Sequence, residues 1–188
     1  LFLRGEWEVS TRLYEALVGH TVAVFARPVG EGRWVALGRG AVQALGFDDD
    51  HALLPFGPQS FQGHRLLQEY YAFPQRFLFV QLAGLGPVVR ACTTQELEIV
   101  ILFDSKDSLL DNAIEPNLLA LHCAPAINLF PRRADRIHLS NQAREYYVVS
   151  DQTRPMDFEV YSVMEVVGHG QAVQQRFFPF YECKDRKS

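Results

Sequence analysis

The chain lacks the sequence patterns that most catalysis and membrane insertion require. Its 188 residues contain no G-x-S-x-G, no H-E-x-x-H and no glycine-rich phosphate loop, which argues against a serine hydrolase, a zinc protease and a nucleotide-binding enzyme. No apolar run approaches the ~20 residues of a membrane-spanning helix, and the first residues do not follow the pattern of a signal peptide. These absences favour a soluble scaffold over an enzyme, with no direct membrane insertion.

Cysteine is scarce, and neither sign of charge dominates. The three cysteines, Cys92, Cys123 and Cys183, share no metal-ligand spacing, so we interpret them as buried thiols in a reducing compartment. The formal net charge is −4, which creates no positive field for a nucleic-acid backbone. We therefore expect no nucleic-acid partner.

Titratable residues show no catalytic grouping along the chain. The six histidines occur singly, and the run Asp48, Asp49 and Asp50 lacks the alternating oxygen ligands of a calcium loop, so we interpret it as a solvated turn. The sequence predicts no catalytic residue, no metal and no cofactor. Two alternatives stay open: a β-rich ligand-binding module, which needs an apolar pocket with convergent polar groups, and an uncatalogued hydrolase, which needs carboxylates or histidines brought together by folding.

Aromatic residues and strand formers are abundant instead. The chain contains 14 Phe and 7 Tyr, and such residues favour sheets. The length corresponds to one ordinary domain or two small ones. We predict an α+β fold, rich in antiparallel sheet, with two principal helices. The segment 48–62 is an irregular connection and a possible internal boundary. Because the chain opens without methionine inside an apolar run, residues 1–188 are expected to be a fragment of a longer protein.

Hydrophobic periodicity places the predicted elements. Val9, Leu13 and Leu17 recur every four residues and predict a helix that ends near Gly19. A second helix runs from 63 to Pro74, which ends it, and its broad apolar and aromatic coverage predicts packing on more than one side. Segments 21–29, 33–38 and 41–47 alternate as in an antiparallel meander, 83–94 reads as a loop, and 105–116 as a short turn capped by Asp107 or Ser108. The further predicted strands are 76–82, 96–104, 117–123, 135–139, 145–151, 156–167 and 176–183.

Three long segments resemble one known family. "LLPFGPQSFQGHRLLQEYYAFPQRFLFV", "CAPAINLFPRRADRIHL" and "YYVVSDQTRPMDFEVYSVMEVVG" are similar to the middle of the TssF family, also called VasA or ImpG, of the bacterial type VI secretion system. The opening "LFLRGEWEVSTRLYEALVGHTVAV" is similar to the family's lead-in to that region. The resemblance covers almost the whole chain, and its motifs are long and unusual.

The resemblance implies a structural baseplate wedge component without catalytic residues or cofactors. It implies assembly with TssG, TssK and a second copy of TssF, in the cytoplasm of a Gram-negative bacterium, at the inner-membrane-anchored secretion complex, where the baseplate supports sheath assembly and contraction. Nine positions match the family well and serve either the fold or an interface, which the sequence does not separate. They are Tyr70, Phe73, Pro74, Pro125, Asn128, Leu129, Phe130, Arg133 and Asp135.

Two side-chain groups carry further alternatives. The group of Arg132, Arg133, Asp135 and Arg136 is either an interface anchor or a loop salt bridge, because guanidinium groups hold carboxylates in fixed geometry. The tail aromatics are either satellite core, which we favour, or a hook for a partner. They are Phe177, Phe178, Phe180 and Tyr181.

Overall fold

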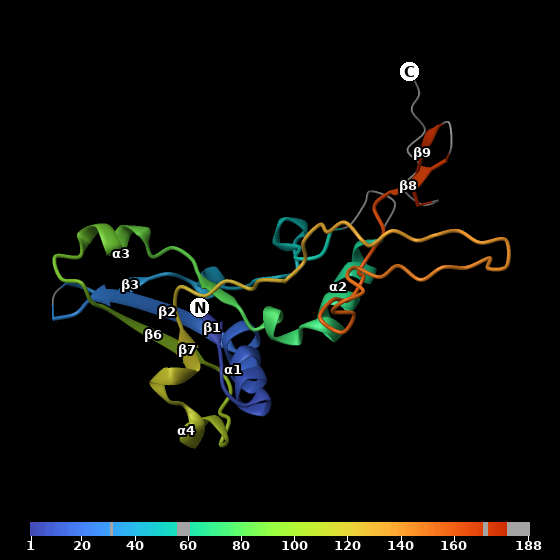
Figure 1. Ribbon diagram of the computed structural model, residues 1–188. Helices are drawn as coiled ribbons and strands as arrows, with labels where there is room; N and C mark the ends of the chain where they lie inside the picture. Colours follow the sequence, from blue (N-terminus) through green and yellow to red (C-terminus); the bar gives the residue numbers. More distant parts are fainter. Residues whose placement is uncertain (31, 56–60, 171–172, 180–188) are drawn as a thin grey trace. The chain divides into compact units, whose positions relative to one another are not determined.

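The computed structural model describes residues 1–30, 32–55, 61–170 and 173–179 (Figure 1). The chain divides into two compact units, Leu1–Ile127 and Asn128–Ser188. Helices are mixed with antiparallel strands, which confirms the predicted α+β class. The internal boundary predicted at 48–62 stays a prediction, and residues 56–60 of that segment lie outside the described residues.

The first unit contains all the α-helices described and most of the strands. In chain order its elements are β1 (Phe2–Leu3), α1 (Trp7–Gly19), β2 (Thr21–Pro28), β3 (Val35–Ala36), η1 (Arg39–Ala41), β4 (Val42–Ala44), η2 (Asp49–His51), α2 (Gln62–Ala72), η3 (Pro74–Phe77), β5 (Val80–Leu82), α3 (Gly86–Ala91), β6 (Leu97–Phe103), α4 (Leu110–Ala113), η4 (Pro116–Leu118) and β7 (Leu119–Ala120). The η elements are 3₁₀ helices. The second unit contains β8 (Val166–His169) and β9 (Gln174–Phe177).

Strand β2 is the centre of the largest sheet. It pairs antiparallel with β3 on one side and with β6 on the other, as Figure 1 shows. Its inward positions Val24 and Ala26 are fully buried, which agrees with the alternation that predicted strands at 21–29 and 96–104. The predicted meander ends at β3, however. Strand β4 pairs with β5, because Gly38, at φ 82°, and η1 redirect the chain after β3.

Helix α1 covers the core as its periodicity predicts. Leu13 and Leu17 are buried and pack with Leu3, Val24 and Val80 in one hydrophobic cluster. Full burial of a leucine or valine side chain contributes about 1.5–3 kcal/mol. The helix therefore joins β1, the central sheet and the β4–β5 pair into one body.

Proline positions explain where local structure departs from the prediction. Pro74 ends α2 and begins η3, so the predicted strand 76–82 shortens to β5. Pro87 lies in the first turn of α3, where a missing N–H costs nothing, and this helix occupies part of the predicted loop 83–94. In the predicted turn 105–116, Asp107 Oδ1 accepts the N–H of Leu109 at 2.9 Å. The N-cap position of α4 itself is Leu109, which has no side-chain cap, so capping by Asp107 or Ser108 stays a prediction.

The second unit is mostly extended without being paired into sheets. Among its described residues only β8 and β9 form a ladder, an antiparallel hairpin. The predicted strands 135–139 and 145–151 are wrong, and 156–167 is wrong except at its last two residues. An extended segment becomes a strand only when a neighbour supplies a ladder of backbone hydrogen bonds, and here the Asp135 N–H to Val149 carbonyl bond, at 3.1 Å, is an isolated one.

Several side chains are more exposed than predicted. Cys92 is half-buried and Cys123 is exposed, so the buried-thiol interpretation is wrong for both, while Cys183 lies outside the described residues. Phe177 and Phe178 are exposed, so they are not satellite core. The other two tail aromatics, Phe180 and Tyr181, lie outside the described residues.

Candidate functional site

A buried ionic cluster positions helix α2. Arg65 and Glu69 lie one turn apart on the helix and Arg76 follows in η3, and all three are at most 3% exposed. Glu69 Oε2 lies 3.3 Å from Arg65 Nη1 and also contacts Arg76 Nη1. A single carboxylate therefore bridges two guanidinium groups inside the first unit, and its removal would leave buried positive charge.

The same cluster binds the backbone of residues 46–54. Glu69 Oε1 accepts the N–H groups of Leu53 and Leu54, each at 3.0 Å. Arg76 Nη2 donates to the carbonyls of Gly46, at 3.0 Å, and His51, at 2.6 Å. Burial, and next the nearby Arg65, lower the pKa of Arg76 below the ordinary value of an arginine. These contacts fix α2, η3 and the preceding loop to one another.

The opposite side of α2 exposes three large apolar residues beside the polar His64 and Gln68. Leu67 is 57% exposed, Tyr70 47% and Tyr71 82%. The ring of Tyr70 lies 5.8 Å from that of Tyr71 and 6.1 Å from that of Phe77. The helix therefore packs on its own unit through polar Arg65 and Glu69, and packing of its outer face by another chain stays a prediction.

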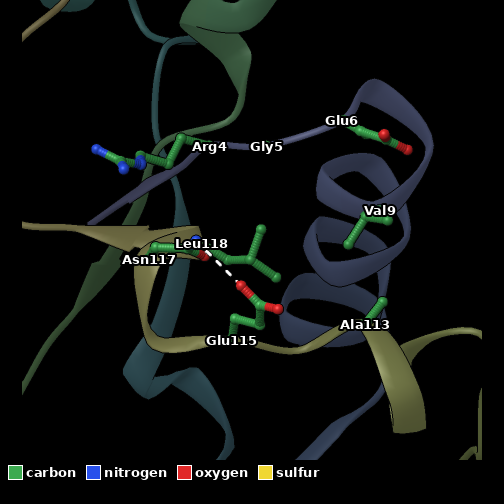
Figure 2. Close-up of a pocket in the computed structure, with 8 residues that line it drawn as sticks. All are labelled: Arg4, Gly5, Glu6, Val9, Ala113, Glu115, Asn117 and Leu118. Atoms are coloured by element: carbon green, nitrogen blue, oxygen red, sulfur yellow. Dashed lines mark hydrogen bonds between the residues drawn. The ribbon is translucent and has the colours of Figure 1, made fainter.

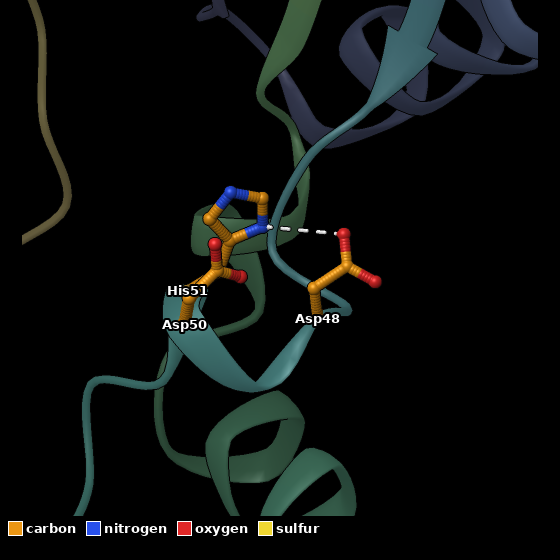
Figure 3. A group of neighbouring side chains, drawn as sticks. All are labelled: Asp48, Asp50 and His51. Atoms are coloured by element: carbon orange, nitrogen blue, oxygen red, sulfur yellow. Dashed lines mark ion pairs between the residues drawn. The ribbon is translucent and has the colours of Figure 1, made fainter.

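Three neighbouring residues of the η2 turn form the group drawn in Figure 3. One ligand atom from each of Asp48, Asp50 and His51 lies within 4.8 Å of the others. His51 Nδ1 is 3.3 Å from the backbone nitrogen of Gly46 and 3.9 Å from Asp48 Oδ2. Both carboxylates are exposed, as is common for surface turns. The geometry agrees with the predicted solvated turn.

An open hollow lies between the start of α1 and the segment around η4 (Figure 2). Its volume is about 430 Å³. Glu115 Oε2 accepts the side-chain N–H of Asn117 at 3.1 Å, so these two polar groups contact each other, and Arg4 and Glu6 at the rim are exposed. The hollow is not an enclosed apolar pocket with convergent polar groups, as a ligand-binding module would need.

Side chains hold together the extended part of the second unit. Arg132 Nη2 lies 2.7 Å from Asp151 Oδ2, and Asp135 Oδ2 accepts the N–H of Gln152 at 2.7 Å. Hydrogen bonds from the hydroxyl and N–H of Thr153 lower the pKa of Asp151, and Arg132 adds to this effect. The Arg132 guanidinium lies 4.0 Å from the ring centroid of Phe158. Arg132 therefore forms a salt bridge within the second unit, which was one of the two alternatives for its group.

The matched family positions fall into two groups. Tyr70, Phe73 and Pro74 lie together at the end of α2. The others follow one another along extended chain, and within the second unit all of them are exposed: Asn128, Leu129, Phe130, Arg133 and Asp135. Pro125 belongs to the first unit and is half-buried. Whether these nine serve the fold or an interface stays a prediction.

The sequence analysis missed the charged residues that hold α2 in place and those that hold the extended part of the second unit. Arg65 and Glu69 have the i, i+4 spacing of a helical ion pair, which was a usable signal, but such pairs usually lie on a solvated face. Arg76 joins them through the turn at Pro74. Asp151 lies 19 residues from Arg132 in the sequence, and no local pattern connects the two.

The described residues 128–165 contain no helix or strand and expose many large apolar side chains. Peptide in this state cannot bury such side chains by itself, and exposed apolar surface in quantity marks interaction sites. We call this segment the extended arm. Its exposed apolar residues are Leu129, Phe130, Ile137, Leu139, Tyr147, Val148, Met156, Val160, Tyr161 and Met164.

Helix α2 is fixed by a buried ionic cluster, and the extended arm exposes many apolar residues. Both are features of a subunit whose exposed apolar surface is covered by other protein. The family model "Type VI secretion system, TssF" matches residues 1–188. The chain belongs to this family, which confirms the resemblance found in its motifs. No helix within the described residues is both long and apolar enough to span a membrane.

Two relatives show how much of the family's subunit the chain represents. It is 50% identical over 186 residues to the type VI secretion system component TssF1 of Pseudomonas aeruginosa, covering 98% of this chain and 30% of that protein. It also resembles a chain of the TssK-TssF-TssG baseplate subcomplex determined by cryo-electron microscopy, with a TM-score of 0.61 and 29% identity, covering 92% of this chain and 32% of that one. The chain thus spans about a third of each relative's length.

Proposed function

We propose that the chain is the central part of a structural subunit of the type VI secretion baseplate wedge. The observation that carries this proposal is the extended arm, whose exposed apolar side chains need a covering partner. Family membership over all 188 residues supports it, as does the likeness to a chain of a TssK-TssF-TssG baseplate subcomplex. The subunit performs no catalysis and carries no cofactor.

The partners in this proposal are TssG, TssK and a second copy of TssF. The assembly lies in the cytoplasm and is associated with the inner-membrane-anchored secretion complex. Its role is geometric: stable interfaces hold the subunits in place, and a change in their packing transmits the signal for sheath contraction. Rigid elements such as α2 suit this role because pre-organised surfaces lose little conformational freedom on binding.

The hydrolase alternative finds little support in the described residues. Within these residues, one group brings carboxylates and a histidine together, and it lies on an exposed turn. It consists of Asp48, Asp50 and His51. A general base or nucleophile is usually tuned by burial and by an oriented partner. The hollow near α1 likewise lacks the enclosure that a binding module needs. Neither alternative is proposed further.

The arm can be tested by adding charge to its most exposed apolar positions. In the full-length subunit, we would combine Leu139→Asp, Tyr147→Asp and Met156→Asp, at positions that are 81%, 90% and 94% exposed. Within residues 1–188 these side chains are exposed, so the substitutions disturb no core contact of this part of the subunit, and circular dichroism checks that the full-length variant keeps its fold. Co-expression with TssG and TssK, followed by size-exclusion chromatography, should show loss of the complex.

The matched control adds the same three negative charges at exposed polar positions, Gln95→Asp, Asn141→Asp and Gln142→Asp. This variant should co-elute with TssG and TssK like the unchanged subunit. Failure of the unchanged full-length subunit to assemble with either protein would refute the proposed function. If the arm variant and the control assembled equally well with TssG and TssK, the extended arm would no longer support the proposed function.

A further inference from the structure

Strand β6 lies at an open edge of the three-stranded sheet. Within the described residues it pairs with β2 alone, on one side (Figure 1). We propose that a strand from the part of the full-length subunit outside residues 1–188 pairs with the other side of β6 and continues the sheet. This inference goes beyond the baseplate role and does not rest on it, because it concerns how the subunit itself is completed.

The register of the ladder determines which backbone groups of β6 point to the open edge. The N–H of Val29 donates to the Glu96 carbonyl at 3.1 Å, so the even-numbered residues of β6 are the ones that bond to β2. In an antiparallel ladder, the residues between them turn their N–H and C=O groups to the other side. Leu97, Ile99 and Ile101 therefore present these groups along the open edge, where no strand of the described chain pairs with them.

The burial of side chains agrees with an uncovered edge on this side. Val24 and Ala26 of β2 are 0% exposed. Their cross-strand partners on β6, Ile101 and Ile99, face the same side of the sheet but are only half-buried. Both isoleucines pack against the core cluster, and a further strand beside them would remove more of their apolar area from water, which is favourable.

The sequence of β6 has none of the features that protect an exposed edge. Proteins blunt such edges with lysine, proline, a bulge or a very short strand. Strand β6 has seven residues, LEIVILF, and its one charged side chain, Glu98, is bonded to Arg27 at 2.8 Å. The register shift of the ladder lies toward the other end, between Thr21 and Ala23 of β2. An apolar edge of this length promotes aggregation when it is left open, so we expect it to be covered.

A segment of the same subunit is the most favourable occupant. The chain spans 30% and 32% of the lengths of the two relatives, so more than two-thirds of each relative lies outside the matched region. A strand tethered in the same chain pairs without the entropic cost of bringing two molecules together. It also covers the edge as the subunit folds, whereas a strand supplied by a partner would leave the free subunit prone to edge-to-edge association.

The side chains next to the edge define the kind of strand. On one face of the sheet the new strand would lie beside Ile99 and Ile101. On the other face it would lie beside Val100 and Leu102, because side chains alternate along β6. Glu98 is already paired within the sheet, so the new strand needs no opposing cation. We therefore expect a continuous apolar run, as in a strand buried on both faces.

Residue-resolved hydrogen exchange of the free full-length subunit tests whether the edge is paired. Electron-transfer fragmentation after deuterium labelling measures individual amides, and β6 contains its own matched control, because the amides of Glu98 and Val100 bond to β2 in either case. With a further strand present, the amides of Ile99 and Ile101 should exchange within about tenfold of these controls. At an open edge they would exchange on the order of a hundredfold or more faster, and this alternation along β6 would refute the proposal.

Photocrosslinking identifies the strand. Benzoylphenylalanine replaces Leu102, which is 48% exposed, in a mixture of isotope-labelled and unlabelled free full-length subunit, and the captured peptide is identified by mass spectrometry. The expected product joins position 102 to an apolar peptide of the same chain from outside residues 1–188. A control photo-residue at exposed Glu15 of α1 should not capture this peptide. Joining of labelled to unlabelled chain, capture of a peptide within residues 1–188, or no capture at all overturns the proposal.

The outcomes separate this inference from the proposed function. Both measurements use the free subunit, and assembly with TssG and TssK is measured independently. If β6 shows the alternating exchange pattern in a subunit that assembles, the pairing of this edge is refuted and the proposed function stands. If β6 is protected in a subunit that does not assemble, the reverse holds. Protection of Ile99 and Ile101 that develops only after TssG and TssK are added would assign the edge to a partner and contradict the proposal.

Discussion

Neutralising Glu69 should destabilise the first unit far more than its single charge suggests. Glu69→Gln preserves the volume of the side chain and removes the negative charge between Arg65 and Arg76. Arg76 keeps its bonds to backbone carbonyls, but the two buried guanidinium groups then face each other without a carboxylate between them. Removing one member of a buried ion pair costs about 3–5 kcal/mol.

This energy should appear as local opening of α2 and the loop that it holds. Because 1.4 kcal/mol corresponds to tenfold in an equilibrium constant, backbone amides of residues 46–55 and 62–76 should exchange with deuterium on the order of a hundred- to a thousandfold faster. Hydrogen-exchange mass spectrometry of the full-length subunit measures this directly. Leu53 and Leu54, whose N–H groups bond to Glu69 at 3.0 Å, should change most.

Glu98→Gln is the matched control. It removes a carboxylate from the Arg27–Glu98 pair, which has a 2.8 Å contact but side chains 34% and 43% exposed. Pairs of this kind contribute about 0–1 kcal/mol, so exchange in β2 and β6 should change less than tenfold. If Glu69→Gln and Glu98→Gln had equally small effects, the ionic cluster would not be what holds α2.

Three further perturbations address the core, one turn and the second unit. Leu13→Ala, at a position that is 5% exposed, should lower the free energy of unfolding by about 2–5 kcal/mol, read from urea denaturation; a loss below 1 kcal/mol would contradict its place in the core. Gly5→Ala should destabilise by more than about 1 kcal/mol in the same assay, because φ is +126° and a Cβ would lie 2.5 Å from Leu118 Cδ2; an unchanged midpoint would show that the turn can relax. The lowered pKa of Asp151 means that its stabilising effect is present above the ordinary aspartate value of 3.8 and is lost as the pH falls through the lower folded-state value. An NMR titration of its carboxyl carbon should therefore show a midpoint below 3.8, and Arg132→Gln should move this midpoint upward, whereas no movement would exclude the Arg132 contact in solution.

Local periodicity predicted the elements that bury one face and expose the other. Helix α1 has a stripe of Val9, Leu13 and Leu17, of which Leu13 and Leu17 are buried, and such a stripe favours one orientation of the helix on the core. Strand β2 alternates in burial over its second half, and it pairs with β6 from Thr21 to Pro28, with one register shift between Thr21 and Ala23. Proline marked the end of α2 correctly, since it cannot continue a helix.

Prediction failed where structure depends on distant partners. Whether β4 follows β3 or pairs with β5 depends on residues about 40 positions away, and alternation within 41–47 contains no such information. Segments 135–139 and 145–151 contain strand formers, yet the described chain provides no ladder for them. Strand propensity reflects packing against neighbours more than a preference of the backbone, so it cannot by itself predict pairing.

The candidate site was only partly predictable for the same reason. Motif resemblance selected Tyr70, Phe73 and Pro74, which do lie together at the end of α2. It did not indicate that the helix would bury Arg65 and Glu69 and expose Leu67. The usual expectation is the reverse, because charged residues are almost never fully buried unless paired, and the pairing partner Arg76 comes from the next element.

The sequence by itself determined the family, the α+β class, the principal helices and the central strands, because these depend on motif identity and on the spacing of residues close in the chain. The tertiary structure alone decided which strands pair, which charges are buried and which aromatic rings remain exposed. Burial and pairing are properties of residues brought together from distant positions, and local patterns carry little information about them. Helix α2 illustrates that difference: Leu67 and Tyr71 are exposed, while Arg65 and Glu69 on its inner side are buried together with Arg76 of η3.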